Sequence, residues 1–121
     1  MRENRRVVVI DDDELICAHV VALLQPEGFE VYDATRAASG LALLHEHEPA
    51  VVLVDMIMPD KDGVELIQEI RRRWPKMRVV AMSGGGRLSP NLYLEIASQV
   101  GAHVCLPKPL TLEQLLAAFE G

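Results

Sequence analysis

Short runs of apolar residues alternate along the chain with longer stretches in which apolar residues recur every three or four positions. An uninterrupted apolar run rich in β-branched residues is typical of a strand that is buried on both faces. Runs of this kind predict strands at residues 7–10, 29–32, 51–55, 78–82 and 104–106. The stretches that follow them have the spacing of amphipathic helices and predict helices at residues 15–24, 36–48, 64–74, 90–99 and from 112 onwards.

Residues that favour helix ends mark several of these boundaries. The aspartates at 11–13 are N-cap candidates for the first helix, and Thr35 is a candidate for the second. Ser89 followed by Pro90 has the pattern of an N-cap and a first-turn proline, and residues 111–114 have the pattern of a capping box. Within the first helix, the residues at helical spacing are Leu15, Ile16, His19, Val20, Leu23 and Leu24.

Strands and helices that alternate in this way predict a doubly wound α/β fold, in which right-handed crossovers keep the strands parallel. We expect a flavodoxin-like, five-stranded sheet of order 2-1-3-4-5 with five helices, which places the first and third strands side by side. The chain of 121 residues has room for one such domain, over residues 1–121, and we expect no output domain.

Composition narrows the classes of function. The formal net charge of −6 disfavours non-specific DNA binding, which depends on a cationic protein surface that contacts the phosphates. No apolar run approaches the ~20 residues of a membrane span, and no signal-type segment follows the charged start. Cys17 and Cys105 lack the spacing of a zinc site or a redox pair. We therefore expect a cytoplasmic protein that binds neither DNA nor membranes.

Polar side chains follow several of the predicted strands at the point where each strand ends. They are Asp11 and Asp12 after the first, Asp55 at the third, Ser83 after the fourth and Lys108 after the fifth. Because the carboxyl ends of parallel strands meet at one edge of a sheet, the carboxylates converge and repel one another unless a cation intervenes. An all-oxygen set of this kind suits Mg²⁺. Carboxylates, a hydroxyl and an ammonium group around one point indicate a phosphoryl-transfer site.

Together these residues resemble the receiver domain of response regulators, the phosphoacceptor module of two-component signalling. Each motif is weak alone, whereas their combination and spacing over essentially the whole chain are specific. The matching residues are the acidic pair Asp11 and Asp12, then Asp55 with the downstream turn residues Met58, Pro59, Asp62 and Gly63, then Ser83, and finally Lys108 with Pro109.

The resemblance implies that a phosphoryl group passes from a phosphohistidine to the Asp55 carboxylate. The donor is a sensor histidine kinase or a histidine phosphotransfer protein, and small-molecule phosphodonors are expected to replace it. The implied cofactor is Mg²⁺, with Mn²⁺ as a substitute, held by Asp12, Asp55 and the backbone carbonyl of Ile57. Asp11 would act on the metal through water. A chain of this family is a signalling protein rather than an enzyme.

The resemblance also implies how the site acts on the rest of the molecule. Lys108, Ser83 and Gly84 would bind the phosphoryl group, and the bond between Lys108 and Pro109 would be cis. Ser83 would then turn towards Asp55, and the face formed by the fourth helix, fifth strand and fifth helix would change its contacts with an unidentified downstream protein. Single-domain receivers are expected to be monomers or weak dimers.

Two alternatives stay open. Cys105 stands where the family usually has an aromatic switch residue, so its role in the switch is open and a degenerate receiver that acts as a constitutive interaction module is possible. Asp11 and Asp13 form an Asp-x-Asp motif of the kind found in aspartyl-phosphate phosphatases. In such a phosphatase, labelling would mark Asp11 rather than Asp55.

Overall fold

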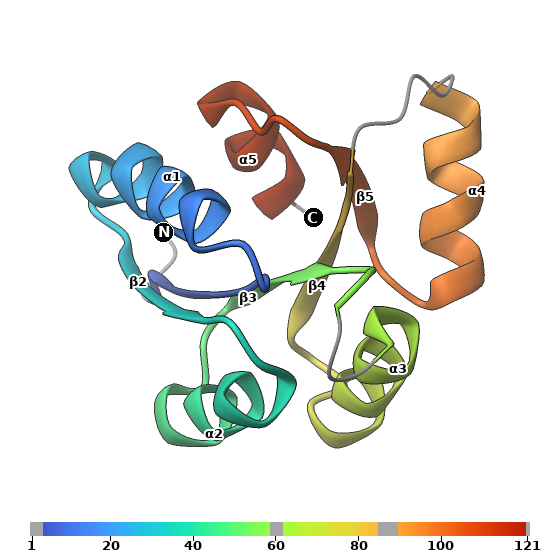
Figure 1. The fold of residues 1–121 in the computed structure, drawn as a ribbon, viewed down its shortest axis with the longest axis horizontal. Coiled ribbons are helices and arrows are strands. Elements are labelled where there is room, and N and C mark those ends of the chain that lie inside the picture. Colours follow the sequence, from blue (N-terminus) through green and yellow to red (C-terminus); the bar gives the residue numbers. More distant parts are fainter. Residues whose placement is uncertain (1–3, 59–61, 85–89, 121) are drawn as a thin grey trace.

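The computed structural model describes residues 4–58, 62–84 and 90–120, which form a five-stranded parallel sheet between two layers of helices (Figure 1). The strand order is β2-β1-β3-β4-β5, so the predicted flavodoxin-like topology is confirmed. The strands are β1 (Arg6–Ile10), β2 (Glu30–Ala34), β3 (Val51–Asp55), β4 (Arg78–Ser83) and β5 (Val104–Pro107).

Helices cover both faces of the sheet. α1 and α5 pack on one face, and α2, α3 and α4 pack on the other (Figure 1). No helix within the described ranges is long and apolar enough to cross a lipid bilayer. The helices are α1 (Glu14–Leu24), the 3-10 turn η1 (Gln25–Glu27), α2 (Ala37–His47), α3 (Gly63–Arg73), α4 (Pro90–Val100) and α5 (Leu112–Phe119).

The apolar run of the central strand β3 is uninterrupted because helices cover both faces of this strand. Val52 and Val54 lie in the core under α2, α3 and α4, whereas Val51 and Leu53 lie in the core under α1 and α5. Because neighbouring residues of a strand point to opposite faces, a strand that is covered on both sides needs apolar residues at successive positions. The run ends at Asp55, the last residue of the strand, which reaches the carboxyl edge of the sheet.

Side-chain caps begin two of the helices where the sequence predicts them. The Asp13 carboxylate accepts a hydrogen bond from the Leu15 N–H at 2.9 Å and caps α1. Thr111 and Gln114 exchange hydrogen bonds with each other's backbone and form the predicted capping box of α5. The predicted cap of α4, Ser89, lies outside the described residues.

The start of α2 differs from the prediction. The helix begins at Ala37, so its N-cap position falls on Arg36, and no side chain makes a capping hydrogen bond there. The prediction that Thr35 caps this helix is therefore wrong. The backbone of Arg36 is extended, with φ −136° and ψ 152°, so Arg36 takes the N-cap position and Thr35 lies one residue before it.

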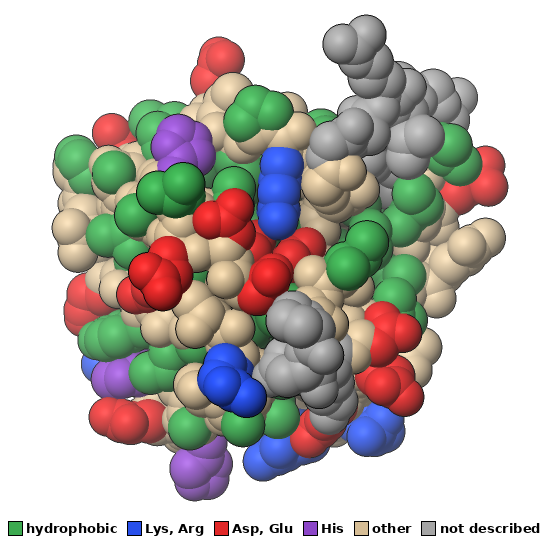
Figure 2. All heavy atoms as spheres, in the orientation of Figure 1, with side chains coloured by type: hydrophobic (Ala, Val, Ile, Leu, Met, Phe, Trp, Pro, Cys, Tyr) green, Lys and Arg blue, Asp and Glu red, His purple; other side chains and the backbone are tan. Residues whose placement is uncertain are grey.

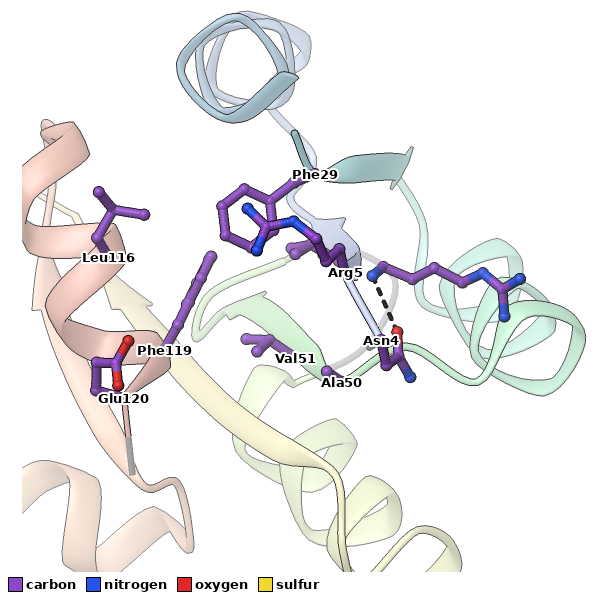
Figure 3. A pocket seen from close by; sticks show the side chains of 10 residues that line it. Asn4, Arg5, Phe29, Ala50, Val51, Leu116, Phe119 and Glu120 are labelled. Atoms are coloured by element: carbon purple, nitrogen blue, oxygen red, sulfur yellow. Dashed lines mark hydrogen bonds between the residues drawn. The ribbon is translucent and has the colours of Figure 1, made fainter. Parts of the chain in front are cut away.

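A hollow lies at the amino end of the strands, opposite to the predicted site (Figure 3). Within it, the Arg5 guanidinium lies 4.1 Å from the centroid of the Phe29 ring and donates to the backbone carbonyls of Glu27 and Gly28. The Phe29 ring meets Phe119 edge to face, with centroids 5.5 Å apart. These contacts join the start of β1 to η1 and to the end of α5, which indicates a structural role.

Candidate functional site

The carboxyl ends of β1 and β3 lie side by side, and the acidic residues at these ends meet there. Ile10 pairs with Val54 in the parallel register, which places Asp11 beside Asp55. Carboxylate oxygens of Asp11, Asp12 and Asp55 lie within 4.8 Å of one another. Figure 2 shows acidic side chains gathered around a basic side chain near the centre of this face of the molecule. The structure therefore brings together the carboxylates that the sequence singled out.

Asp11 is fully buried, and its two oxygens have different surroundings. Oδ1 accepts the Asp13 N–H at 2.9 Å, whereas Oδ2 lies 2.6 Å from the Nζ atom of Lys108. The second contact is a short ion pair between the ammonium group and a buried carboxylate oxygen. Such an oxygen has capacity for a further polar partner. Asp12 is exposed and opens the cluster to solvent.

Asp55 is 5% exposed at the end of β3. Its Oδ1 lies 3.4 Å from Lys108 Nζ and accepts the Ile57 N–H at 3.4 Å. Burial, followed by the neighbouring charge of Asp11, raises the pKa of Asp55 to about 6, although Lys108 and the Ile57 N–H act in the opposite direction. Lys108 thus offsets only part of the negative charge of this site.

Lys108 comes directly after β5, where its backbone N–H donates to the Ser83 carbonyl at 2.8 Å. Its side chain is 16% exposed. Burial by itself would lower the pKa of Lys108, but the carboxylates of Asp11 and Asp55 outweigh burial and raise this pKa above its usual value. The ammonium group therefore keeps its charge. The bond between Lys108 and Pro109 is cis, as the resemblance implied.

Gly63 shapes the backbone around Asp55. A Cβ atom at Gly63 would overlap the carbonyl oxygen of Asp55 and the backbone of Met56. The Gly63 N–H donates to the Met56 carbonyl at 3.1 Å, and the carboxylate of Asp62 caps α3 by accepting the Val64 N–H at 2.9 Å. The predicted turn residues Asp62 and Gly63 thus bring the start of α3 against the end of β3. Pro59 lies outside the described residues.

The remaining candidates lie around the rim or behind it. Ser83 is the last residue of β4, next to the Met82 that pairs with Asp55, and is half-buried. Gly84 is exposed, and a Cβ atom there would meet nothing within 4 Å. Cys105 is 6% exposed and belongs to the core under α4, where burial raises the pKa of its thiol. Ser83 and Gly84 therefore border the site, whereas Cys105 lies in the core.

The donor set of this site fits a hard dication. The residues that could hold a metal, among those described, are the three aspartates Asp11, Asp12 and Asp55. Magnesium prefers oxygen ligands and commonly uses one or two carboxylates, keeping its remaining positions for water or phosphate. The Oδ2 atom of Asp11 and the exposed carboxylate of Asp12 leave capacity for such an ion. Ile57 follows in the loop at the same edge of the sheet.

Two contacts of α1 with this site were missed by the sequence analysis. His19 Nε2 donates to the Leu110 carbonyl at 2.9 Å, across 91 residues, and the Cys17 thiol donates to the Asp11 carbonyl at 3.4 Å. No local sequence pattern predicts either contact, because each depends on how α1 packs against other elements. Asp13, in contrast, caps α1 and is not in the carboxylate cluster, so the Asp-x-Asp motif does not bring both of its carboxylates there.

Comparisons with known proteins agree with this geometry. The family model "Response regulator receiver domain" matches residues 7–120. A receiver domain protein from Clostridium thermocellum is 33% identical, with a TM-score of 0.80 over 94% of this chain and 90% of that chain. A CheY-like receiver domain protein from Methanospirillum hungatei JF-1 is 28% identical, with a TM-score of 0.80 over 95% and 90%. NtrX from Brucella abortus, solved with ATP, is 30% identical, with a TM-score of 0.83 over 95% of this chain and 27% of that chain.

The fold and the matches define a CheY-like receiver of two-component signalling. The chain belongs to the response regulator receiver domain family. Receiver domains interact with histidine kinases or phosphotransfer proteins, and the carboxylate cluster of this chain has the acidic residues through which receivers generally bind Mg²⁺.

Proposed function

We propose that this receiver accepts a phosphoryl group on Asp55 from the phosphohistidine of a sensor histidine kinase or a histidine phosphotransfer protein. The observation that carries this proposal is the Lys108 ammonium, which lies 2.6 Å from Asp11 and 3.4 Å from Asp55. A cation held at this point is next to the place where the oxygens of a phosphoryl group on Asp55 would arrive. In this role the chain is a signalling protein rather than an enzyme.

The transfer exchanges one bond to phosphorus for another. An Asp55 carboxylate oxygen forms a bond to phosphorus while the N–P bond of the phosphohistidine breaks, and the imidazole leaves with that electron pair. Asp55 must be ionised for this attack, although burial and Asp11 raise its pKa to about 6. Lys108 favours the ionised form because its ammonium group stays charged beside the same carboxylate.

A Mg²⁺ or Mn²⁺ ion would be held by Asp12, Asp55 and the Ile57 carbonyl, with Asp11 acting through water. When bound, the ion supplies positive charge that offsets the repulsion between the carboxylates and the phosphoryl oxygens. The protein's own residues position the reaction: Lys108 faces the carboxylate that is modified, and Gly63 keeps the backbone of β3 and α3 in close contact behind it.

The output of the site is a change at the face formed by α4, β5 and α5. Ser83 and Gly84 border the site at the end of β4, and the Ser83 hydroxyl would turn towards a phosphoryl group on Asp55 as a donor. Cys105 lies in the same core cluster as Ala97 and Val100 of α4. Because this thiol is small, the coupling to α4 depends on aliphatic packing rather than on the turning of an aromatic ring. The downstream partner is a protein that recognises this face.

Phosphorylation at Asp55 is tested by intact-mass spectrometry of the protein incubated with acetyl phosphate and Mg²⁺. The wild type is expected to gain the mass of one phosphoryl group, and Asp55→Asn is expected to gain none because the nucleophilic oxygen is lost. Asp33→Asn is the matched control, since Asp33 is an exposed carboxylate on β2 outside the cluster, and it should be labelled like the wild type.

The same experiment separates the alternatives. Peptide mapping of the labelled protein should find the phosphoryl group on Asp55. A label on Asp11 would instead support a phosphatase, and no label on the wild type under conditions in which another receiver is labelled would support a constitutive interaction module.

A further inference from the structure

His19 connects α1 to the loop that carries the site's only described cation. Its Nε2 atom lies 2.9 Å from the backbone carbonyl oxygen of Leu110, two residues beyond Lys108. A carbonyl oxygen can only accept a hydrogen bond, so the proton of the imidazole is on Nε2. His19 is exposed, so burial of its ring does not explain its position. The hydrogen bond to the Leu110 carbonyl links it to a residue far away in the sequence.

The loop from Lys108 to Leu110 is held at both ends. At its start, the Lys108 N–H donates to the Ser83 carbonyl at 2.8 Å. At its end, Leu110 is 2% exposed in the core between α1 and α5, and its carbonyl is bound by His19. The position of the Lys108 backbone between these two anchors determines where its ammonium group can reach.

The helix that carries His19 is itself attached to the acidic side of the site. The N–H of Asp13, its N-cap residue, donates to Asp11 Oδ1 at 2.9 Å, and the Cys17 thiol donates to the Asp11 carbonyl at 3.4 Å. The helix therefore contacts Asp11 at its start and the Lys108 loop six residues after Asp13. The same helix thus contacts the loops that carry both members of the 2.6 Å ion pair.

We propose that His19 is a positioning residue for Lys108. By binding the Leu110 carbonyl, His19 keeps the loop in the position in which the Lys108 ammonium contacts both Asp11 and Asp55. The consequence for phosphorylation rests on the proposed function, because it assumes that Lys108 faces the phosphoryl group. The consequence for the position of the Lys108 side chain is independent of the proposed function.

The test compares His19→Ala with His19→Gln. Gln places an amide N–H at about the reach of the imidazole Nε2–H and keeps the hydrogen bond, whereas Ala removes it. His45→Ala is the matched control, because His45 is an exposed histidine of α2 remote from the loop. All variants are assayed with acetyl phosphate and Mg²⁺ at a temperature at which circular dichroism shows them to be folded.

Loss of one hydrogen bond that positions a reacting group should slow the phosphorylation of His19→Ala about three- to tenfold. His19→Gln should stay within about twofold of the wild type, as should His45→Ala. The rescue by Gln separates positioning from a general loss of stability. Equal rates for His19→Ala and His45→Ala would overturn the proposal, and so would equal losses for the Ala and Gln variants.

A second measurement does not depend on phosphorylation. In ¹⁵N-resolved spectra of the free protein, the Lys108 amide and side-chain resonances should move in His19→Ala and stay in place in His19→Gln. If these resonances move but neither the wild type nor Asp55→Asn takes a phosphoryl group, the proposed function fails and the positioning role stands. If they do not move while the wild type is labelled, the positioning role fails alone.

Discussion

The ring of His103 accepts a hydrogen bond from the backbone through one nitrogen and has a guanidinium group beside the other. The Val79 N–H donates to Nδ1 at 3.0 Å, and the guanidinium of Arg71 lies 3.1 Å from Nε2. Burial, followed by the charges of Arg71 and Arg78, lowers the pKa of His103. The neutral ring thus takes the place of a backbone acceptor at the start of β4, where protonation would remove the lone pair that Val79 uses.

This environment predicts a pH dependence of stability with a definite sign. Because the pKa of His103 is lower in the folded state, the unfolded chain binds the proton more readily. The contribution of His103 is therefore complete above the ordinary histidine pKa of ~6.5 and is lost as the pH falls from that value through the lower pKa of the folded state. In His103→Asn, an amide oxygen can still accept the Val79 N–H but does not titrate. We expect the free energy of unfolding of this variant, measured in urea, to fall less between neutral and mildly acidic pH than that of the wild type.

Other groups titrate in the same range, so the informative quantity is the difference between each variant and the wild type at each pH. His45→Asn, which changes an exposed histidine of α2, should run parallel to the wild type. If the free energy of unfolding of His103→Asn depends on pH in the same way as that of the wild type, His103 does not cause this pH dependence.

At the scale of the elements, the junction between β3 and α3 depends on the absence of one side chain. A Cβ atom at Gly63 would overlap backbone atoms of Asp55 and Met56, which cannot move aside as the end of a flexible side chain can. We expect Gly63→Ala to lower the free energy of unfolding by about 1–3 kcal/mol, the usual cost of overpacking. Gly84→Ala is the control, because a Cβ atom there meets nothing within 4 Å and should change stability by less than about 0.5 kcal/mol. Urea unfolding of both variants measures the contrast, and equal losses would contradict it.

The capping residues of the helices were easier to predict from sequence than the faces that the helices bury. Asp13 and the capping box at Thr111 use hydrogen bonds between near neighbours, and both were predicted correctly. The phase of α1 was less evident from sequence, since Leu15 fits the helical spacing but is 79% exposed, whereas Cys17 is buried against β1 and β2. The apolar spacing of α1 is compatible with several faces, and only packing against the sheet selects one of them. The start of α2 was predicted one residue too early, since the N-cap position falls on Arg36 and not on Thr35.

At the scale of the whole molecule, the carboxylate cluster links metal binding to folding. Asp11, Asp12 and Asp55 come from two strands that meet only in the folded chain, so a bound Mg²⁺ stabilises the folded state selectively. At a Mg²⁺ concentration 100 times the dissociation constant, the free energy of unfolding should rise by about 2.7 kcal/mol. Thermal unfolding with Mg²⁺ and with EDTA measures this gain.

Asp12→Asn should lose most of that gain, because Asp12 is the exposed carboxylate of the cluster. Asp33→Asn should keep it, since Asp33 lies on β2 outside the cluster. An equal gain in Asp12→Asn and the wild type would contradict the proposed ligand set.

The order of strands and helices and the doubly wound topology could be predicted from sequence patterns alone. The same patterns place five polar residues at the carboxyl ends of the strands, namely Asp11, Asp12, Asp55, Ser83 and Lys108. These features follow from patterns that span only a few residues, together with a general rule for connecting parallel strands. The contacts that hold the site together, in contrast, are visible only in the folded molecule. The 2.6 Å ion pair of Lys108 with Asp11, the raised pKa of Asp55 and the contact of His19 with Leu110 join residues far apart along the chain. They depend on how helices and loops pack against the sheet, and such packing has no signature in a local stretch of sequence.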